Sequence, residues 1–276
     1  MPELPEVENI CNALRPLICG RYFVKAEIFT PKLRTPLTPL PQAPILDKPV
    51  SGVRRRGKYM IVDLSGRDAL LVHFGMSGSI RVAEDTSKES RRKHEHVILT
   101  MDNGKTLRFE CPRRFSLFEA IYLPEENGEP AELADLGPEP LSDGFTPEVL
   151  FKALQKKKSP VKTAIMDNSV VVGVGNIYAA ESLFASGISP LRPANKVTIT
   201  ECQLLHDEIK KILTRAIAGG GSTIRDYRHV DGSIGEFARE LAVYGKDGEK
   251  CPRCGNALHS VRLGGRSSVY CPECQK

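Results

Sequence analysis

The first twenty residues carry apolar side chains at the spacing of an amphipathic helix. Six of them recur on one face: Val7, Ile10, Cys11, Leu14, Leu17 and Ile18. This periodicity predicts an α-helix over residues 5 to 18 that stops at Gly20. Prolines at positions 2 and 5 suit the first turn of such a helix, because the N–H groups there have no partner within the helix.

From about residue 21 to residue 123 the pattern changes to short apolar runs typical of β-strands. Four runs stand out: KYMIVDL at 58–64, ALLVHF at 69–74, HVILTM at 96–101 and TLRFEC at 106–111. Between two of them, MDNGKT is a strong hairpin signal, because Asn-Gly favours the tight turn that joins antiparallel strands. This region predicts an antiparallel β-sandwich or barrel.

The chain then becomes rich in proline, glutamate and glycine, and we predict a linker over 131–145. After it, helical spacing or helix-boundary residues recur in the segments 146–155, 159–168, 176–187 and 199–221. We therefore predict an α+β chain with an N-terminal domain over 1–130, a helical domain over 146–243 and a small module over 244–276.

Composition and charge narrow the class of protein. With 276 residues, 41% hydrophobic and 26% charged, the chain is long and apolar enough for two globular domains. It has no apolar run near the roughly 20 residues of a membrane helix, and its acidic start is unlike a signal peptide. We therefore expect a soluble, cytosolic protein that does not bind membranes.

The net charge of +5 permits a polyanionic partner without requiring one. Basic residues gather in four runs, at 54–58, 91–93, 113–114 and 156–158. A single basic run is usually a solvated face, but four runs in separate segments favour a nucleic-acid groove.

The eight cysteines divide into two groups. Cys11, Cys19, Cys111 and Cys202 are scattered, which is typical of small buried side chains. The other four, Cys251, Cys254, Cys271 and Cys274, form two C-x-x-C pairs separated by sixteen residues. This spacing predicts a zinc ribbon in preference to disulfides or a redox pair, and four sulfur ligands predict a structural ion. The hairpin between the pairs presents Arg266 at its tip.

Two further motifs are weaker. Gly173 and Gly175 precede Asn176, which we expect to be a helix N-cap at a potential phosphate site, although a plain interhelical turn explains them equally well. Met76 in HFGMSGS is consistent with a turn or core methionine and Phe115 in CPRRFS with a core aromatic residue, whereas Arg113 is harder to place in a core.

Taken in order, these motifs resemble bacterial formamidopyrimidine-DNA glycosylase, also called 8-oxoguanine DNA glycosylase. The resemblance rests on PELPEVE, RRGKY, HFGMSGS, PRRF, LGPEPL, VVGVGNIYA, STIRDY and the terminal cysteine pairs that end in CQK, and it covers essentially the whole length. It implies an N-terminal helix with a β-sandwich, a helix-two-turn-helix domain and a zinc finger, with DNA in the cleft between the halves.

The resemblance also implies a mechanism. Pro2, once Met1 is removed, is the nucleophile that forms a Schiff base with the damaged nucleotide, and Glu3 is the general acid. Lys58 and Arg266 complete the catalytic set, and Glu6 is a further active-site carboxylate. The implied reaction is base removal followed by β,δ-elimination at the abasic site.

The remaining site residues contact DNA. Lys58, Asn176 and Arg266 match phosphate contacts of the family, and Lys162 is a weaker match of that kind. His94 resembles a DNA-contacting histidine of the family. His96 would lie on the same face of the strand and could be confused with it. Met76, Arg113 and Phe115 match side chains that fill the void left by an everted base. Residues 223–235 match a loop that closes over that base.

We therefore predict a monomeric, cytoplasmic, nucleoid-associated repair enzyme acting on duplex DNA with oxidised purines or abasic sites. It is expected to need one structural Zn²⁺ and no organic cofactor. The alternatives are the endonuclease VIII activity on oxidised pyrimidines, whose members usually begin PEGPE, and a non-catalytic zinc-ribbon protein that binds DNA. Asn9, Ser116 and Ala180 depart from the family, which usually has threonine, glycine and a polar residue there.

Overall fold

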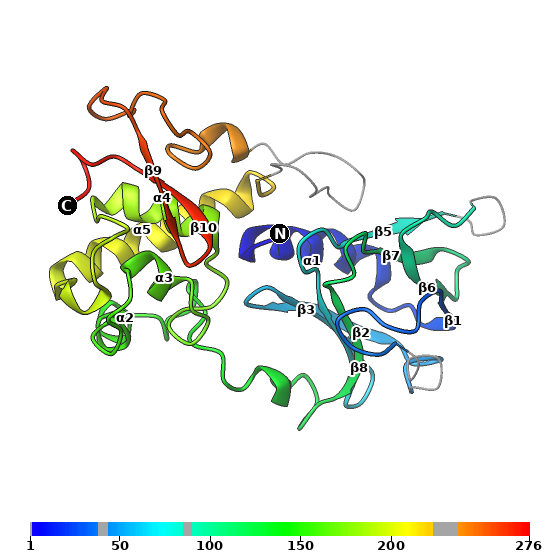
Figure 1. Cartoon of the computed structure of the whole chain (residues 1–276). Helices are drawn as coiled ribbons and strands as arrows, with labels where there is room; N and C mark the ends of the chain where they lie inside the picture. Colours follow the sequence, from blue (N-terminus) through cyan, green and yellow to red (C-terminus); the bar gives the residue numbers. More distant parts are fainter. Residues whose placement is uncertain (1, 38–43, 85–89, 223–236) are drawn as a thin grey trace. The chain divides into compact units, whose positions relative to one another are not determined.

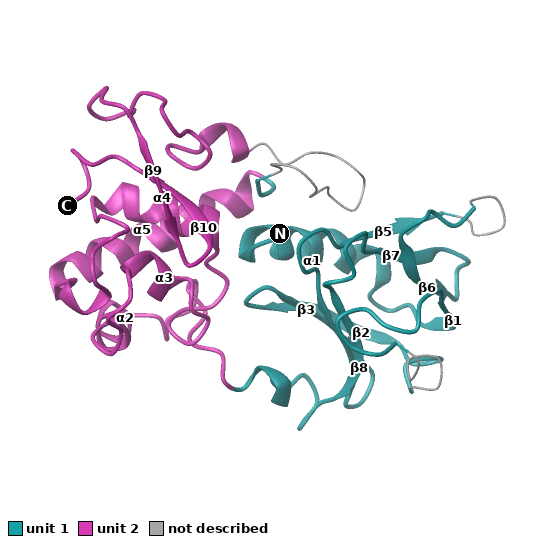
Figure 2. Cartoon of the chain, in the orientation of Figure 1, with its two compact units in different colours: residues 1–134, 220–236 teal, residues 135–219, 237–276 magenta. Residues whose placement is uncertain are grey.

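The computed structural model of the chain describes residues 2–37, 44–84, 90–222 and 237–276 (Figure 1). The chain divides into two compact units (Figure 2). Unit 1 comprises residues 1–134 with 220–236, and unit 2 comprises residues 135–219 with 237–276. The linker over 131–145 and the other sequence-derived domain boundaries stay predictions.

Unit 1 combines one long helix with two antiparallel sheets. The helix is α1 (Leu4–Ile18). One sheet has the order β1 (Phe23–Ile28), β6 (Glu95–Met101), β7 (Thr106–Glu110) and β5 (Ser79–Ala83). The other has the order β2 (Val50–Arg56), β3 (Tyr59–Leu64), β4 (Asp68–His73) and β8 (Leu117–Tyr122). The predicted hairpin joins β6 to β7, where Gly104 adopts a φ of 83°.

The core of unit 1 lies where α1 and the strands bring their apolar faces together. Val7, Ile10, Leu14 and Ile18 of α1 join one buried cluster with residues from both sheets, as their helical spacing predicts. Residues 31–50 are unusually rich in proline, and the sequence suggests no function for them; they add Leu33, Leu37 and Ile45 to this core.

Unit 2 is mainly helical. Its helices are α2 (Pro147–Leu154), α3 (Val161–Ile165), α4 (Asn176–Ser186) and α5 (Ile199–Ala218), and its strands β9 (His259–Leu263) and β10 (Arg266–Tyr270) form a hairpin. Local chemistry sets several ends: Thr198 and Glu201 cap the start of α5, and α4 ends at Gly187 in the left-handed conformation.

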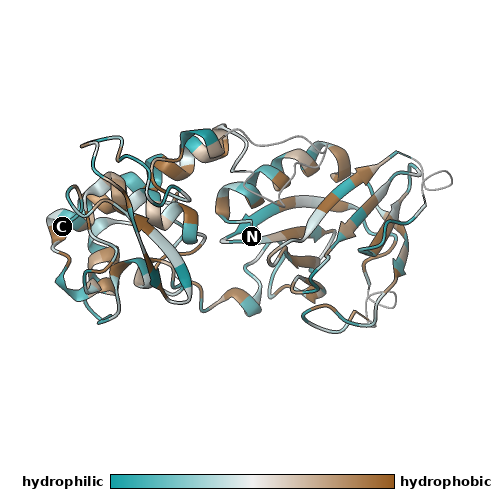
Figure 3. Ribbon diagram, turned by 45° about the horizontal axis from the view of Figure 1, so that its top comes forward, coloured by the Kyte–Doolittle hydropathy of each residue, from teal (hydrophilic) through white to brown (hydrophobic). Residues whose placement is uncertain are grey.

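The predicted α+β class is confirmed, with an antiparallel sandwich before a helical region and a terminal cysteine hairpin. Coloured by hydropathy, helices and strands of both units show apolar and polar stretches in alternation (Figure 3). Within the described ranges, no helix combines the length and the apolar character required to cross a bilayer.

Candidate active site

The start of α1 is buried around Pro2 and Glu3. Glu3 is only 3% exposed, and its N–H donates to the Glu6 carboxylate over 2.8 Å. The other carboxylate oxygen of Glu6 accepts the N–H of Ser222 at 2.8 Å and its hydroxyl at 3.1 Å. Glu6 therefore ties the N-cap of α1 to a segment more than two hundred residues further along the chain.

This second segment approaches α1 closely. Gly221 has a φ of 79°, and a Cβ added there would lie 3.0 Å from a Glu6 carboxylate oxygen. Both its backbone conformation and its surroundings therefore favour glycine. The predicted closing loop, residues 223–235, follows Ser222 and lies outside the described residues, as does Met1.

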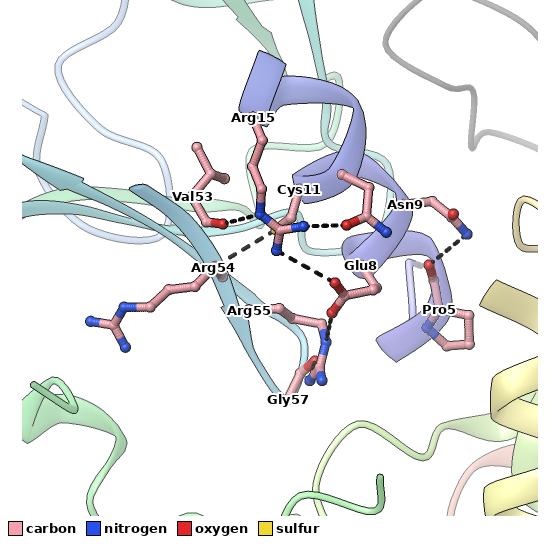
Figure 4. Close-up of polar contacts among 10 residues, drawn as sticks. Pro5, Glu8, Asn9, Cys11, Arg15, Val53, Arg54, Arg55 and Gly57 are labelled. Carbon is pink, nitrogen blue, oxygen red and sulfur yellow. Dashed lines mark hydrogen bonds and ion pairs between the residues drawn. The ribbon is translucent and has the colours of Figure 1, made fainter. Parts of the chain in front are cut away.

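A second set of contacts connects α1 to Gly57, the residue before Lys58 in the sequence (Figure 4). Glu8 of α1 pairs with Arg55 at 2.8 Å, and Arg55 also donates to the carbonyl of Gly57 at 3.1 Å. Gly57, with a φ of 57°, forms the turn between β2 and β3, and Lys58 follows it directly. A single arginine, with a side chain 9% exposed, therefore spans from the helix to the turn that carries Lys58.

Further contacts of α1, nearer its C-terminal end, hold the helix against β2. Arg15 donates to the carbonyl of Val53 at 2.7 Å and lies 3.6 Å from Glu8 (Figure 4). The Cys11 thiol donates to the carbonyl of Arg54, and burial raises the pKa of that thiol to about 12. Cys11 is therefore a packed, unreactive residue, as its isolated position in the sequence suggests.

His73 is a functional candidate that the sequence analysis missed. It pairs with Tyr59 across β3 and β4, with ring centroids 4.8 Å apart. Burial, followed by the nearby charges of Arg34 and Lys58, lowers its pKa to about 4. Its Nδ1 accepts the N–H of Gly75 at 3.0 Å, so the neutral ring carries its proton on Nε2. The sequence signal that could have identified His73 is its position at the end of an apolar strand run, directly before the Met76 turn.

Met76 and Phe115 are exposed large apolar side chains, 41% and 56% accessible. The guanidinium of Arg113 lies 5.5 Å from the centre of the Phe115 ring, within cation–π range. Neither apolar side chain belongs to the core, so the alternative interpretation of these two residues as core residues is wrong.

The two histidines near β6 differ in environment. His96 is buried and its Nε2 lies 3.2 Å from the carbonyl of Cys111, whereas His94 is only half-buried. Burial lowers the pKa of His96, which favours its neutral form. His94 is therefore the more accessible of the two for an external ligand.

The prediction that Asn176 is an N-cap is wrong by one residue. The N-cap is Gly175, with extended backbone angles of −117° and −157°, and Asn176 is the first residue of α4. The side-chain Oδ1 of Asn176 is buried and has no hydrogen-bond partner among the described residues. This unpaired acceptor makes Asn176 a candidate to bind an external hydrogen-bond donor.

Lys162 and Arg266 have different environments. Lys162 is 1% exposed, and its ammonium donates to the Ser268 hydroxyl at 2.8 Å and the Ser267 carbonyl at 3.3 Å. Both serines follow Arg266 on β10, and Arg266 itself is exposed. The lysine therefore supports the hairpin from α3, while the arginine faces solvent.

The four C-terminal cysteines form a compact sulfur cluster. All four Sγ atoms lie within 4.8 Å of one another, with Cys251 to Cys274 at 3.9 Å and Cys254 to Cys271 at 3.5 Å. These separations exceed the roughly 2.05 Å of a disulfide. The neighbouring Cys254 thiol raises the pKa of Cys274 to about 12, because several thiolates cannot ionise this close together without a cation. The cluster fits zinc, which takes four thiolates tetrahedrally.

The cysteine hairpin is anchored on α4. Glu181 accepts three backbone N–H groups, from Ala242, Val243 and Tyr244, at 2.8 to 3.0 Å. An apolar cluster joins the same helix to the hairpin and contains Ala180, Phe184, Val243, Cys251, Leu258, Val269 and Cys271. The helix that begins at Asn176 therefore also supports the module that carries Arg266.

Models of known protein families match three consecutive parts of the chain. Family models for the formamidopyrimidine-DNA glycosylase N-terminal domain, the H2TH domain of that enzyme, and a zinc finger found in FPG and IleRS match residues 1–118, 136–228 and 248–276. A formamidopyrimidine-DNA glycosylase from Dichelobacter nodosus is 43% identical over the full length of both chains. The chain belongs to the formamidopyrimidine-DNA glycosylase family.

Other members of this family are similar to the chain over nearly all of its length. The enzyme of Stenotrophomonas maltophilia strain R551-3 is 46% identical over the whole of both chains. The MutM (FPG) protein of Thermus thermophilus superposes with a TM-score of 0.87 at 36% identity, covering 99% of this chain and 98% of that one. A Lactococcus lactis FPG mutant bound to DNA containing Fapy-dG gives a TM-score of 0.89 at 32% identity over all of both chains.

Membership settles several predictions. The chain is a base-excision-repair DNA glycosylase with AP lyase activity, and its cysteine module is a zinc finger. The predicted activity on oxidised purines in DNA and the predicted zinc ion are confirmed. The interpretation as a zinc-ribbon protein without catalysis is wrong.

Proposed function

We propose that this glycosylase acts through Pro2. Its free secondary amine attacks C1′ of the damaged nucleotide, the C1′–N bond to the base breaks, and the base leaves with the electron pair and gains a proton. The resulting iminium acidifies the proton at C2′, whose removal expels the 3′ phosphate. A second elimination expels the 5′ phosphate. The amine is free only after Met1 is removed.

Glu3 is proposed as the acid that protonates the sugar ring oxygen, which opens the ring as the iminium forms. Its burial, with 3% exposure, directly after Pro2 supports this role. Glu6 is proposed to hold this arrangement through the N–H groups of Glu3 and Ser222.

We propose that Lys58, Asn176 and Arg266 bind phosphates around the flipped nucleotide, and that His94 and Arg113 add DNA contacts. The exposure of Arg266 and the unpaired amide atom of Asn176 support this assignment. For Lys162 we now propose support of the Arg266 hairpin in place of a phosphate contact, because its ammonium is buried against Ser267 and Ser268.

Met76, Arg113 and Phe115 are proposed to occupy the space of the everted base. Removing a base from the stack costs a few kcal/mol, and an apolar wedge with a donor for the orphaned partner offsets part of that cost. An arginine suits a partner cytosine, whose acceptors face it. The exposure of Met76 and Phe115 supports this role.

We also propose that the enzyme acts as a monomer in the bacterial cytoplasm, in association with the nucleoid. The domain boundaries at residues 130, 145 and 243 are proposed as the functional division, with 131–145 as a linker, 146–243 as the DNA-binding helical domain and 244–276 as the zinc-finger module. Bacterial relatives that match over their whole length support this setting.

One observation carries the mechanism: Pro2 and Glu3 are buried at the start of the helix that Arg55 connects to the Lys58 turn. The test is borohydride trapping on a duplex with 8-oxoguanine opposite cytosine. We expect a covalent adduct with the parent protein and none with Pro2→Gly, which should still bind DNA. Intact mass of the parent should show that Met1 is absent.

An active protein that retains Met1 would contradict the mechanism. So would an equal yield of adduct from Pro2→Gly. If the parent forms an adduct only with oxidised pyrimidines, the substrate assignment fails while the role of Pro2 stands.

A further inference from the structure

One buried serine joins the two turns that carry the proposed wedge. Ser116 is fully buried, and its hydroxyl donates to the carbonyl of Phe74 at 2.7 Å. The same oxygen lies 2.8 Å from the sulfur of Cys111. Phe74 precedes the Met76 turn, whereas Cys111 and Ser116 flank the segment with Arg113 and Phe115. The link therefore crosses from one wedge segment to the other.

The protons in this link can be assigned by counting donors. A carbonyl only accepts, so the single hydroxyl proton of Ser116 points to Phe74. The thiol of Cys111 must then donate to Ser116, which makes a chain of two hydrogen bonds that ends at the Phe74 carbonyl. The N–H of Gly78, which closes the Met76 turn, donates to that same carbonyl at 2.8 Å.

The backbones of the two turns also touch. A Cβ added at Gly75 would lie 2.7 Å from the carbonyl carbon and oxygen of Phe115, and one added at Gly78 would lie 2.6 Å from the Ser116 hydroxyl. On its other side, the Ser116 carbonyl accepts the N–H of Arg34 at 3.0 Å. With no room for a side chain at either glycine, displacement of one turn moves the other.

We infer that Ser116 is a positioning residue for base eversion, and that its hydroxyl fixes the spacing of Met76 relative to Arg113 and Phe115. The inference rests on the proposed role of those three residues as the wedge. A glycine at this position would leave the two turns in contact but would remove both hydrogen bonds of the Ser116 hydroxyl.

The hydrogen bonds of Ser116 should matter more for release of the damaged base than for strand cleavage at an abasic site. Excision of an intact lesion requires the wedge to enter as the base leaves the stack, so a poorly spaced wedge slows base release. An abasic site has no base to evict, so strand cleavage there depends less on wedge spacing. The two activities of one enzyme therefore separate positioning from general loss of stability.

The experiment compares Ser116→Ala with the parent under single-turnover conditions on two duplexes, one with 8-oxoguanine opposite cytosine and one with a preformed abasic site. Loss of a buried hydrogen bond predicts about fivefold slower base release and less than about twofold slower abasic cleavage. A 2-aminopurine beside the lesion reports wedge entry, and its fluorescence change should slow with base release. Cys111→Ala should also slow base release, but by less than Ser116→Ala does.

Ser186→Ala is the matched control, because it removes a serine hydroxyl bond of 2.8 Å to the Ser182 carbonyl within α4. It should leave both rates and the fluorescence unchanged. Unchanged base release by Ser116→Ala, or equal losses on both duplexes with a lower melting temperature, would overturn the positioning role. Failure of the parent to form a borohydride adduct would instead refute the proposed function.

Discussion

Buried polar side chains at the start of α1 and beside it determine how the candidate site is held together. Glu6 accepts hydrogen bonds from Glu3 and Ser222, and His73 has a defined tautomer because the N–H of Gly75 occupies its Nδ1. Each such group is buried only because specific hydrogen bonds replace its contacts with water. Loss of a partner of Glu6 therefore leaves an unsatisfied carboxylate in the turn of α1 that follows Pro2.

The pKa of His73 predicts an acid-sensitive contribution to stability. The folded pKa of about 4 lies below the ordinary 6.5, so the unfolded chain takes up a proton first as the pH falls. The free energy of unfolding should therefore drop between pH 6.5 and 4. About 2 kcal/mol of that drop should be present at pH 5.

Urea unfolding at pH 7 and pH 5, for the parent and His73→Gln, measures this difference. His73→Gln keeps a donor at a similar position but does not titrate, so it should lose less stability on acidification. The same pH dependence in both proteins would contradict the burial of a neutral His73.

At the scale of elements, α1 and the β2–β3 hairpin form one functional body through Arg55. Its guanidinium bonds both to the Glu8 carboxylate and to the Gly57 carbonyl, a geometry that suits a planar fork of donors. Pro2 and Lys58 are thereby held at the ends of elements with a common rigid support. For the proposed roles of Pro2 and Lys58, this common support would preorganise the two groups before the reaction.

Arg55→Lys tests that support. Lysine retains the charge near Glu8 but lacks the fork that reaches Gly57, so Lys58 should be less well placed. We expect the single-turnover rate of borohydride trapping to fall about tenfold, with little change in affinity for abasic DNA. Arg56→Lys is a control for the same change of residue type, because Arg56 pairs with Glu129 and not with Glu8. Equal rates for Arg55→Lys and the parent would show that the link is dispensable.

The second unit is organised around α4. This helix begins at Asn176, accepts the 242–244 backbone through Glu181 and packs against the zinc finger, while Lys162 of α3 holds the hairpin strand that begins at Arg266. Two proposed phosphate contacts that lie ninety residues apart in sequence therefore belong to one packed body. A zinc ion bound by the four cysteines stabilises the folded hairpin that carries Arg266.

Removal of zinc should therefore weaken DNA binding. We expect one zinc ion per chain in the parent and less than one in Cys254→Ser, with affinity for abasic duplex reduced at least about tenfold. Metal analysis and a DNA-binding titration on the same samples check this. Cys19→Ser, which alters an exposed cysteine outside the cluster, should retain zinc and affinity. Full DNA affinity in a zinc-free protein would contradict the structural role of the ion.

The sequence determined the features that depend on local spacing. Apolar periodicity defines α1 and the main strands, Asn-Gly defines the β6–β7 turn, and the cysteine spacing defines the zinc finger, because each pattern involves residues close along the chain. Motif resemblance supplied the candidate catalytic residues and the family. The residue preference for N-caps misassigned the cap at Asn176, since a residue's backbone angles and not its type decide where a helix begins.

Only the tertiary structure decided which polar residues are buried and what they hold. Lys162 is buried by serines more than one hundred residues away, Glu6 binds Ser222, and Ser116 bonds to Phe74, forty-two residues earlier. No periodicity along the chain encodes such pairs, because they form where separate elements pack and exclude water. The sequence therefore supplies the reacting groups, and packing between distant segments fixes the positions from which they act.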